Sequence, residues 1–228
     1  MRGWVLMSAF DPKADVPVVK STPQSCIRQV STRVARAFKA DGFRRNAPHL
    51  WRERNDLVNI VNFQASRWGS AEAGSFTINL ASTNRHLYST WTGRMFPANP
   101  GVATWPVHTR IGALAGRTDL WWDVDESTDA SALAELIVDS FRPGILEWFE
   151  AIPSLAALDS RLSTYRKYGD VPGVHEGQLP LIQAIIKRHS GDVLAAGQCL
   201  ERASVASRGT GFAQTVSTIA ERLDYGIP

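Results

Sequence analysis

DLVNIVNFQASRW (residues 56–68) and, after a connection rich in Gly, Ser and Ala, SFTINLAS (residues 75–82) decide the fold of this chain. In both runs apolar and polar residues alternate, which is typical of strands with two different faces. The residues of the apolar faces are Val61, Phe63 and Ala65 in the first run and Phe76, Ile78 and Leu80 in the second. Pairing these faces in register predicts an antiparallel hairpin with one side toward a core.

The other side of the predicted hairpin carries five uncharged hydrogen-bonding side chains. They are Asn62, Gln64, Ser66, Thr77 and Asn79. A solvated sheet face usually contains Lys, Glu or Arg, and buried polar groups need partners, so this face indicates a surface that something partly covers. The cover is either a loop or helix of the chain itself, which is the simpler explanation, or a bound ligand.

Length and composition predict a globular protein. The chain has 228 residues, of which 44% are hydrophobic and 21% charged, and it is long enough to bury a full core. The opening MRGWVLMSAFDPK has too short an apolar run for a signal peptide or an anchor, so we predict no membrane association. Residues 1–20 are expected to form a disordered or loosely attached lead-in, with Met7 as an alternative start.

The two cysteines predict the compartment. Cys26 and Cys199 lie far apart, each within an apolar helical pattern, and neither has the spacing of a metal ligand. We therefore expect buried free thiols in a reducing cytoplasm, and we predict no metal and no cofactor.

The net charge of +3 conceals two blocks of opposite sign. Residues 20–54 contain nine Lys and Arg against two Asp and Glu, a balance of +7. Residues 119–150 contain nine Asp and Glu against one Arg, a balance of −8. Such blocks can pair within the fold or face separate partners. We expect internal pairing, because it requires no second molecule.

Further elements follow from periodicity and from turn residues. A helix is predicted from a hydroxyl cap before Pro23 to Gly42, and its apolar stripe is expected to pack on the hairpin. Other strands are predicted at 49–54, 109–115 and 120–123, with a long loop at 83–108. Helices are predicted after residue 129, with a break at Pro143-Gly144, and at 155–165, 179–189, 192–203 and 212–223.

These elements predict an α+β fold. Residues 21–168 are expected to form an antiparallel sheet of four to five strands packed by helices. Residues 169–228 are expected to form a helical C-terminal extension packed on the same domain. The Gly- and Pro-rich stretch at residues 169–177 marks the boundary between the two.

Several motifs occur in a characteristic order between about residues 24 and 152. They are Gly42-Phe43 at a helix end, Asn62-Phe63-Gln64 with Ser66, Phe76 with Asn79-Leu80, Arg110-Ile111-Gly112, and Trp121-Trp122 before an acidic turn. This order resembles DUF4304, a bacterial domain family of unknown function, although Ala81 stands where a glycine is commoner. The resemblance implies a fold and a set of positions, and it implies no chemistry.

No catalytic residue is predicted. The five histidines lack the spacing of metal or catalytic motifs, and neither a GxSxG sequence nor a P-loop occurs. The acidic run from Asp119 to Glu126 has oxygen ligands suited to a divalent cation, but capping of the following helix explains it more simply.

Three further residues are candidate binding residues beside the amides. Arg110 lies in a strand between small and apolar residues, where its guanidinium can hold a carboxylate of a ligand or, as we expect, of Asp119 or Asp123. Trp121 and Trp122 point to opposite faces of an extended chain, so one is expected in the core and one exposed as a binding anchor.

The function predicted from these features is a non-catalytic module that binds a protein partner, and one version is an immunity-type protein that neutralises a toxin. An alternative is a small-ligand binder or enzyme that uses Asn62, Gln64 and Asn79 under the 83–108 loop. A second alternative, nucleic-acid binding through residues 20–54, is disfavoured because the same domain carries the acidic block.

Overall fold

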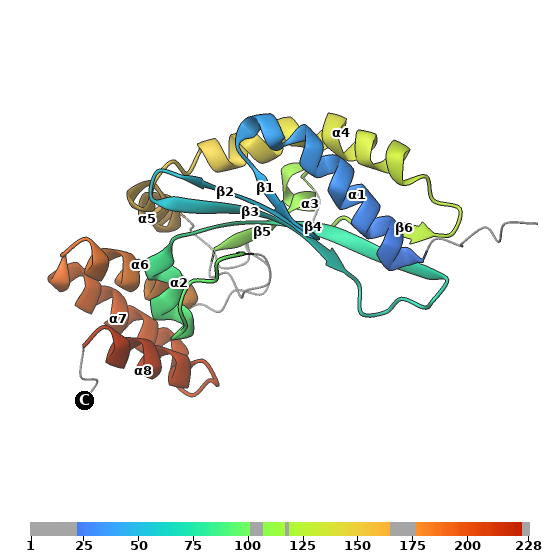
Figure 1. The fold of residues 1–228 in the computed structure, drawn as a ribbon. Helices are drawn as coiled ribbons and strands as arrows, with labels where there is room; N and C mark the ends of the chain where they lie inside the picture. The colour runs from blue at the N-terminus through green and yellow to red at the C-terminus, as the bar shows by residue number, and fades with distance from the viewer. Residues whose placement is uncertain (1–21, 101–106, 117–118, 165–176, 225–228) are drawn as a thin grey trace, which may run out of the picture.

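The computed structural model describes residues 22–100, 107–116, 119–164 and 177–224. These residues form a six-stranded antiparallel sheet with helices on both sides (Figure 1), which confirms the α+β class. The strands are β1 (Arg44–Asn46), β2 (His49–Arg54), β3 (Leu57–Ala65), β4 (Ala73–Thr83), β5 (His108–Arg110) and β6 (Trp122–Asp125). Their order is β1-β2-β3-β4-β5, and β6 pairs with β4. The expected lead-in at residues 1–20 lies outside the described residues.

The predicted hairpin is formed by β3 and β4. Val61 lies opposite Leu80, Asn62 opposite Asn79 and Phe63 opposite Ile78, so the apolar faces coincide as predicted. The apolar side belongs to the main core, which also contains residues of α1 (Pro23–Ala37) and α4 (Ala130–Glu150). Both helices run across this side of the sheet (Figure 1).

Helix α1 begins at the predicted signal, but it ends at Ala37, and the predicted Gly42 ends the short helix that follows. The Thr22 side chain accepts a hydrogen bond from the Ser25 amide at 3.2 Å, and Pro23 occupies the first turn, where its missing N–H is not needed. The short helix η1 (Lys39–Asp41) follows, and Gly42 ends it with a φ of 83°, a conformation that favours glycine. Phe43 then packs edge-on against Phe38.

The strand predicted at residues 109–115 is wrong beyond Arg110. Strand β5 ends there, and α3 (Ile111–Leu114) follows as a single helical turn. The reason lies in β4, because the edge along which a longer β5 would continue is occupied by β6, with Gly74 opposite Val124. Ile111 instead turns into the main core, where it is fully buried.

The break predicted at Pro143-Gly144 is also wrong, because α4 continues through Pro143 to Glu150. A proline inside a helix removes one hydrogen bond and costs about 3 kcal/mol. Packing offsets this cost, since Ile145 and Phe149 from the second half of α4 lie in the same core as Ile137 from the first half.

The segment 83–108 is not a loop throughout, because it contains α2 (Arg85–Thr92). Tyr88 of α2 packs with Trp51, Ile60 and Ala81 on the second side of the sheet, and Phe96 packs against the same cluster. This segment therefore covers the apolar end of the second side, and the expected cover over the five polar side chains is not provided by this cluster.

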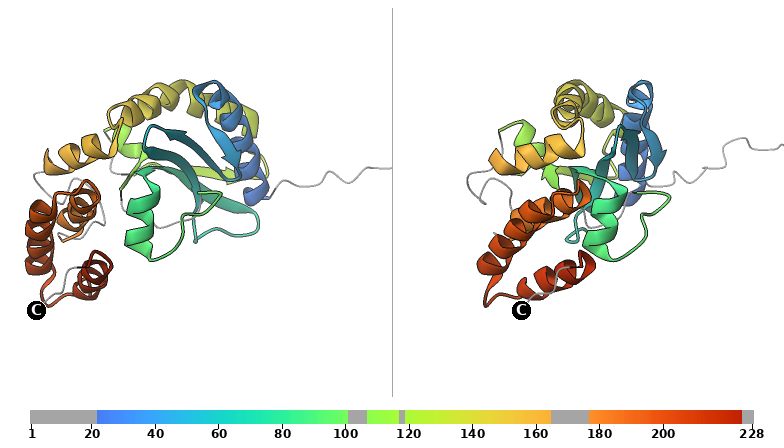
Figure 2. Two further views of the ribbon diagram at one scale, coloured as in Figure 1. Left: turned by 60° about the vertical axis from the view of Figure 1, so that its left-hand side comes forward. Right: turned by 90° about the vertical axis from the view of Figure 1, so that its left-hand side faces the viewer.

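The C-terminal helices are confirmed as predicted. They are α5 (Leu155–Thr164), α6 (Gln178–His189), α7 (Val193–Ser207) and α8 (Ala213–Arg222). Their second core includes Leu57 of β3 and Leu87 of α2, so they pack on the sheet domain. Figure 2 shows α6–α8 on the opposite side of the sheet from α1 and α4. The domain boundary predicted at residues 169–177 lies outside the described residues, apart from Gly177.

The two charge blocks contact each other within the fold: two arginines of the basic block pair with one glutamate of the acidic block, and the single Arg of the acidic block pairs with an Asp of the basic block. Arg142 of α4 binds the Asp41 carboxylate through two nitrogens, with contacts of 2.8–3.1 Å. Arg52 and Arg54 of β2 both pair with Glu150 at the end of α4. Arg52 is only 6% exposed and has an internal partner, so this arginine of the basic block does not belong to a basic surface. None of the described helices is long and apolar enough to cross a membrane.

Arg52 joins three elements at one buried point. Its guanidinium donates to the Asp41 carbonyl at 3.1 Å and to Glu150 Oε1 at 3.0 Å. It also lies over the Phe43 ring, 4.8 Å from the centroid. A buried guanidinium is stabilising only when such contacts replace its lost water, so β2, η1 and α4 must keep their relative positions.

We predict that Arg52→Ala lowers the free energy of unfolding by about 2–4 kcal/mol, because it removes buried packing and leaves the Asp41 carbonyl without its donor. The matched control is Arg54→Ala, which breaks an ion pair to the same Glu150 from a side chain that is 47% exposed. This control is expected to cost less than about 1 kcal/mol. Urea denaturation measures both values, and equal losses would contradict the role assigned to Arg52.

Candidate functional site

The amides of the hairpin form a hydrogen-bonded row on the second side of the sheet. Asn79 Nδ2 donates to Asn62 Oδ1 at 3.1 Å and to Gln64 Oε1 at 2.8 Å. Asn62 Nδ2 in turn donates to His49 Nδ1 at 2.7 Å. The strand register produces this row, because Asn62 lies opposite both Asn79 and His49. We call these four residues the amide face.

The amide face keeps hydrogen-bonding capacity at its outer edge. Gln64 is exposed and Asn79 is half-buried. Among the described residues, no acceptor binds Gln64 Nε2 and no donor binds Asn79 Oδ1. One amide donor group and one amide oxygen are therefore free to bind whatever lies over this face.

Two of the five polar residues predicted for this side do not join the row. Thr77 is fully buried and donates to the Leu120 carbonyl at 2.7 Å, so a neighbouring segment covers it. Ser66 belongs to the hairpin turn, where its side chain accepts from the Trp68 amide. The candidate surface therefore narrows to Asn62, Gln64 and Asn79.

Arg110 extends the amide face, because it lies opposite Asn79 in the sheet. Its Nη1 binds Asp119 Oδ2 at 2.6 Å, which is one of the two internal pairs expected. Trp121 Nε1 donates to the same oxygen at 2.8 Å, and the Arg110 guanidinium lies 5.6 Å from the Trp121 ring centroid. We call Arg110, Asp119 and Trp121 the anchor cluster.

The anchor cluster is held together by charge although it is partly exposed. The hydrogen bond from Trp121, followed by the one from Arg110, holds the pKa of Asp119 below its ordinary value. The carboxylate therefore remains charged at neutral pH and keeps both partners in place. Such a cluster needs little rearrangement before it binds another molecule.

Trp122 is not part of this surface. Its ring stacks on Phe76 with a centroid distance of 5.4 Å and packs edge-on against Phe141. Both contacts belong to the main core. Of the two neighbouring tryptophans, Trp122 therefore packs against the main core, whereas Trp121 contacts Arg110 and Asp119 in the anchor cluster.

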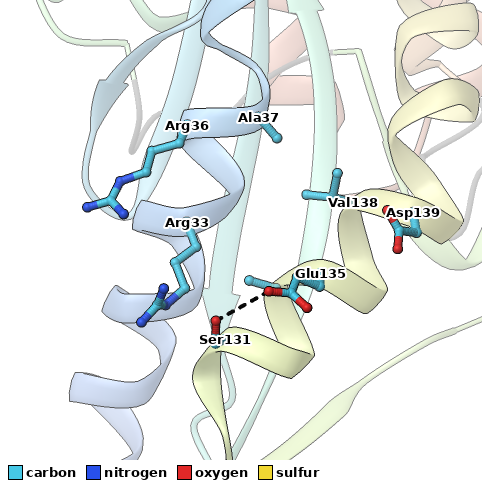
Figure 3. A pocket seen from close by; sticks show the side chains of 8 residues that line it. Arg33, Arg36, Ala37, Ser131, Glu135, Val138 and Asp139 are labelled. Carbon is cyan, nitrogen blue, oxygen red and sulfur yellow. Dashed lines mark hydrogen bonds between the residues drawn. The ribbon is translucent and has the colours of Figure 1, made fainter.

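A second candidate surface is the charged groove between α1 and α4, with a cavity of about 240 Å³. Arg33 and Arg36 line it from α1, and Glu135 and Asp139 line it from α4. In Figure 3 both arginines extend away from α4. None of these four charged side chains forms an ion pair with a described residue. The ion pairs between the two blocks therefore lie in the second half of α4, and the charges that line this groove are not part of them.

The acidic turn before α4 has structural roles. Asp125 accepts from Ser127 and Thr128, and these hydrogen bonds hold its pKa below the ordinary value. The Asp129 carboxylate caps α4 by accepting from the Ser131 and Ala132 amides. No cluster of three or more His, Cys, Asp or Glu that could hold a metal occurs in the described ranges.

His49 was missed by sequence reasoning. It is the first residue of a predicted strand, and its place in the row depends on the register of that strand against Asn62. The ring is buried, and burial lowers the pKa of His49. Its Nδ1 accepts from Asn62, so the neutral ring is the form that fits the row.

Comparison with known proteins identifies one family. The family model described as "Domain of unknown function (DUF4304)" matches residues 34–151. The matched range contains the whole amide face, the anchor cluster and the sheet. No curated protein and no solved structure matches the chain.

We predict that His49 makes the protein less stable in mild acid. Because its folded pKa lies below the unfolded value of about 6.5, the unfolded chain binds the proton more tightly. Stability is therefore fully present above pH 6.5 and falls below it, by up to about 1.4 kcal/mol per pH unit for one group.

Urea denaturation at several values between pH 7 and pH 5 measures this loss. His49→Gln should reduce the slope. A parallel contribution is expected from His86, whose pKa is lowered by burial and by His189. An unchanged slope in His49→Gln would show that the row tolerates a protonated ring.

Proposed function

We propose that this chain, which belongs to the DUF4304 family, is a non-catalytic binding module that recognises a protein partner through the anchor cluster and the amide face. The observation that carries the proposal is the joining of Arg110, Asp119 and Trp121 beside the row of amides.

Residue type supports a protein partner. Trp and Arg are enriched among the few residues that contribute most of the energy of a protein interface. Here Trp121 and Arg110 are positioned by one carboxylate, so little side-chain entropy remains to be lost on binding. The adjacent amides both donate and accept, as the peptide groups of a partner do.

The environment of His49 supports a non-catalytic role. A general base must reach the proton that it removes. His49 is buried, and its Nδ1 is occupied by the Asn62 amide. His49 thus serves the row itself.

One version of the proposal is an immunity-type protein of the bacterial cytoplasm that neutralises a toxin. Cys26 and Cys199 are free and buried, which suits a reducing compartment, and the partly exposed anchor cluster suits recognition of a folded surface. In that case the captured partner should lose its toxic activity when the chain is added.

We predict that Trp121→Ala weakens binding of the partner at least about thirtyfold, the effect of removing an interface residue worth about 2 kcal/mol. The matched control is Trp68→Ala in the hairpin turn, where the ring is 96% exposed and lies outside the cluster. Cross-linking in an extract of the source cells identifies the partner, and calorimetry with the purified partner measures the affinity. Equal affinities for the two variants would contradict the proposed surface.

A small ligand is the second candidate for the same face. The free Gln64 Nε2 and Asn79 Oδ1 favour it, because they offer a donor and an acceptor beside a charged pair. Native mass spectrometry of the freshly purified protein separates the two candidates. A retained small molecule that is lost in Gln64→Leu would favour the ligand, whereas a bare protein that binds a protein partner would favour the module.

A further inference from the structure

Helices α1 and α4 lie side by side and present charges of opposite sign to solvent (Figure 3). The charged residues of α1 are all basic and exposed: Arg28, Arg33 and Arg36. The acidic residues of α4 are all exposed: Glu135, Asp139, Glu147 and Glu150. Arg142, the one basic residue of α4, is already bound to Asp41. The outer surface of this helix pair is thus basic over α1 and acidic over α4.

Four of these charges line one groove without pairing across it. Arg33 and Arg36 form one wall. Glu135 and Asp139 form the other, and Ala and Val side chains complete the lining. Glu135 accepts one hydrogen bond, from Ser131 of its own helix at 3.5 Å, which is long for such a bond. Because the walls do not neutralise each other, the groove matches a molecule that carries charges of both signs.

A second copy of the chain carries both signs in the required arrangement. In a dimer with two-fold symmetry, the same surface of each protomer forms the interface, and every contact occurs twice. A two-fold axis that runs along the groove would place α1 of each protomer over α4 of the other, so that basic walls face acidic walls. An axis across the helices would place α1 over α1 and bring like charges together. The charge pattern therefore selects the first arrangement.

The size of the helix pair indicates a weak interface. Helix α1 is about 22 Å long and two packed helices are about 19 Å wide, so the footprint on each protomer is about 400 Å². Leu136 is 55% exposed and lies three residues before Asp139, on the same side of α4, where it adds apolar area. Interfaces of such limited area form transient complexes. We therefore expect a dimer that depends on protein concentration.

We infer that the surface formed by α1 and α4 binds a second copy of this chain, with Arg33 and Arg36 of each protomer facing Glu135 and Asp139 of the other. This surface lies on the core side of the sheet, whereas the amide face lies on the second side. The dimer therefore leaves both amide faces open, and the inference does not depend on the proposed protein partner.

Sedimentation velocity of the full chain over a range of protein concentrations tests the inference. The mass should rise toward that of two chains, and less so at high salt, which screens exposed charges. The variants Arg33→Glu/Arg36→Glu and Glu135→Arg/Asp139→Arg each give both walls one sign, so each should weaken the dimer at least about tenfold. Mixed in equal amounts, the two variants should associate with each other, because one supplies acidic walls and the other basic walls.

The matched control is Arg67→Glu/Arg94→Glu, which makes the same change of net charge at exposed positions outside the helix pair and should dimerise normally. Trp121→Ala should also dimerise normally, which separates this inference from the proposed binding surface. Melting temperatures show whether each variant is folded.

The inference would be overturned by a monomer at every concentration, by equal weakening in the control, or by reversed variants that do not associate when mixed. A monomer that binds a different protein through Arg33 and Arg36 would overturn the assignment to a second copy.

Discussion

The structure depends on the pairing of β3 with β4 in one register. Each strand presents a different environment on each side, so a shift by one residue would turn Phe63 and Ile78 outward and the amides into the core. Strand β4 also pairs with β5 along one part of its length and with β6 along another. Consequently the register of a single hairpin determines where α1 and α4 pack, where Arg110 stands and how the amides meet.

The parts of the fold that the sequence predicts are those governed by local periodicity. The hairpin, α1 and the C-terminal helices each repeat apolar residues at the period of their own element, and no neighbour competes with them. The wrong predictions concern elements whose ends are determined by packing against other elements. Strand β5 is short because β6 occupies the same edge of β4, and α4 passes through Pro143 because the core holds both of its halves. Neither fact is encoded in the local sequence pattern.

In the candidate site, too, the residues set by the local pattern could be predicted, and those set by contacts between elements could not. The alternation along β3 and β4 predicts the amides, and the position of Arg110 in a strand followed by an acidic run predicts its pair with Asp119. His49 requires the register between β2 and β3, which depends on a turn of two residues. The start of α2, which covers one end of the same side, has a recognisable signal in Asn84, since Asn is a favoured helix cap, but a helix must be expected in residues 83–108 before that signal has meaning.

Helix α2 explains why the second side of the sheet is covered at one end and open at the other. Its middle, through Tyr88, covers the apolar end of that side and leaves the amide face beyond this cover. Its start is fixed by Asn84, whose Oδ1 accepts from the Leu87 amide in the first turn. The helix cannot slide toward the amides, since Leu87 is buried in the core shared with α6–α8. The packing that fixes α2 therefore keeps the amide face open.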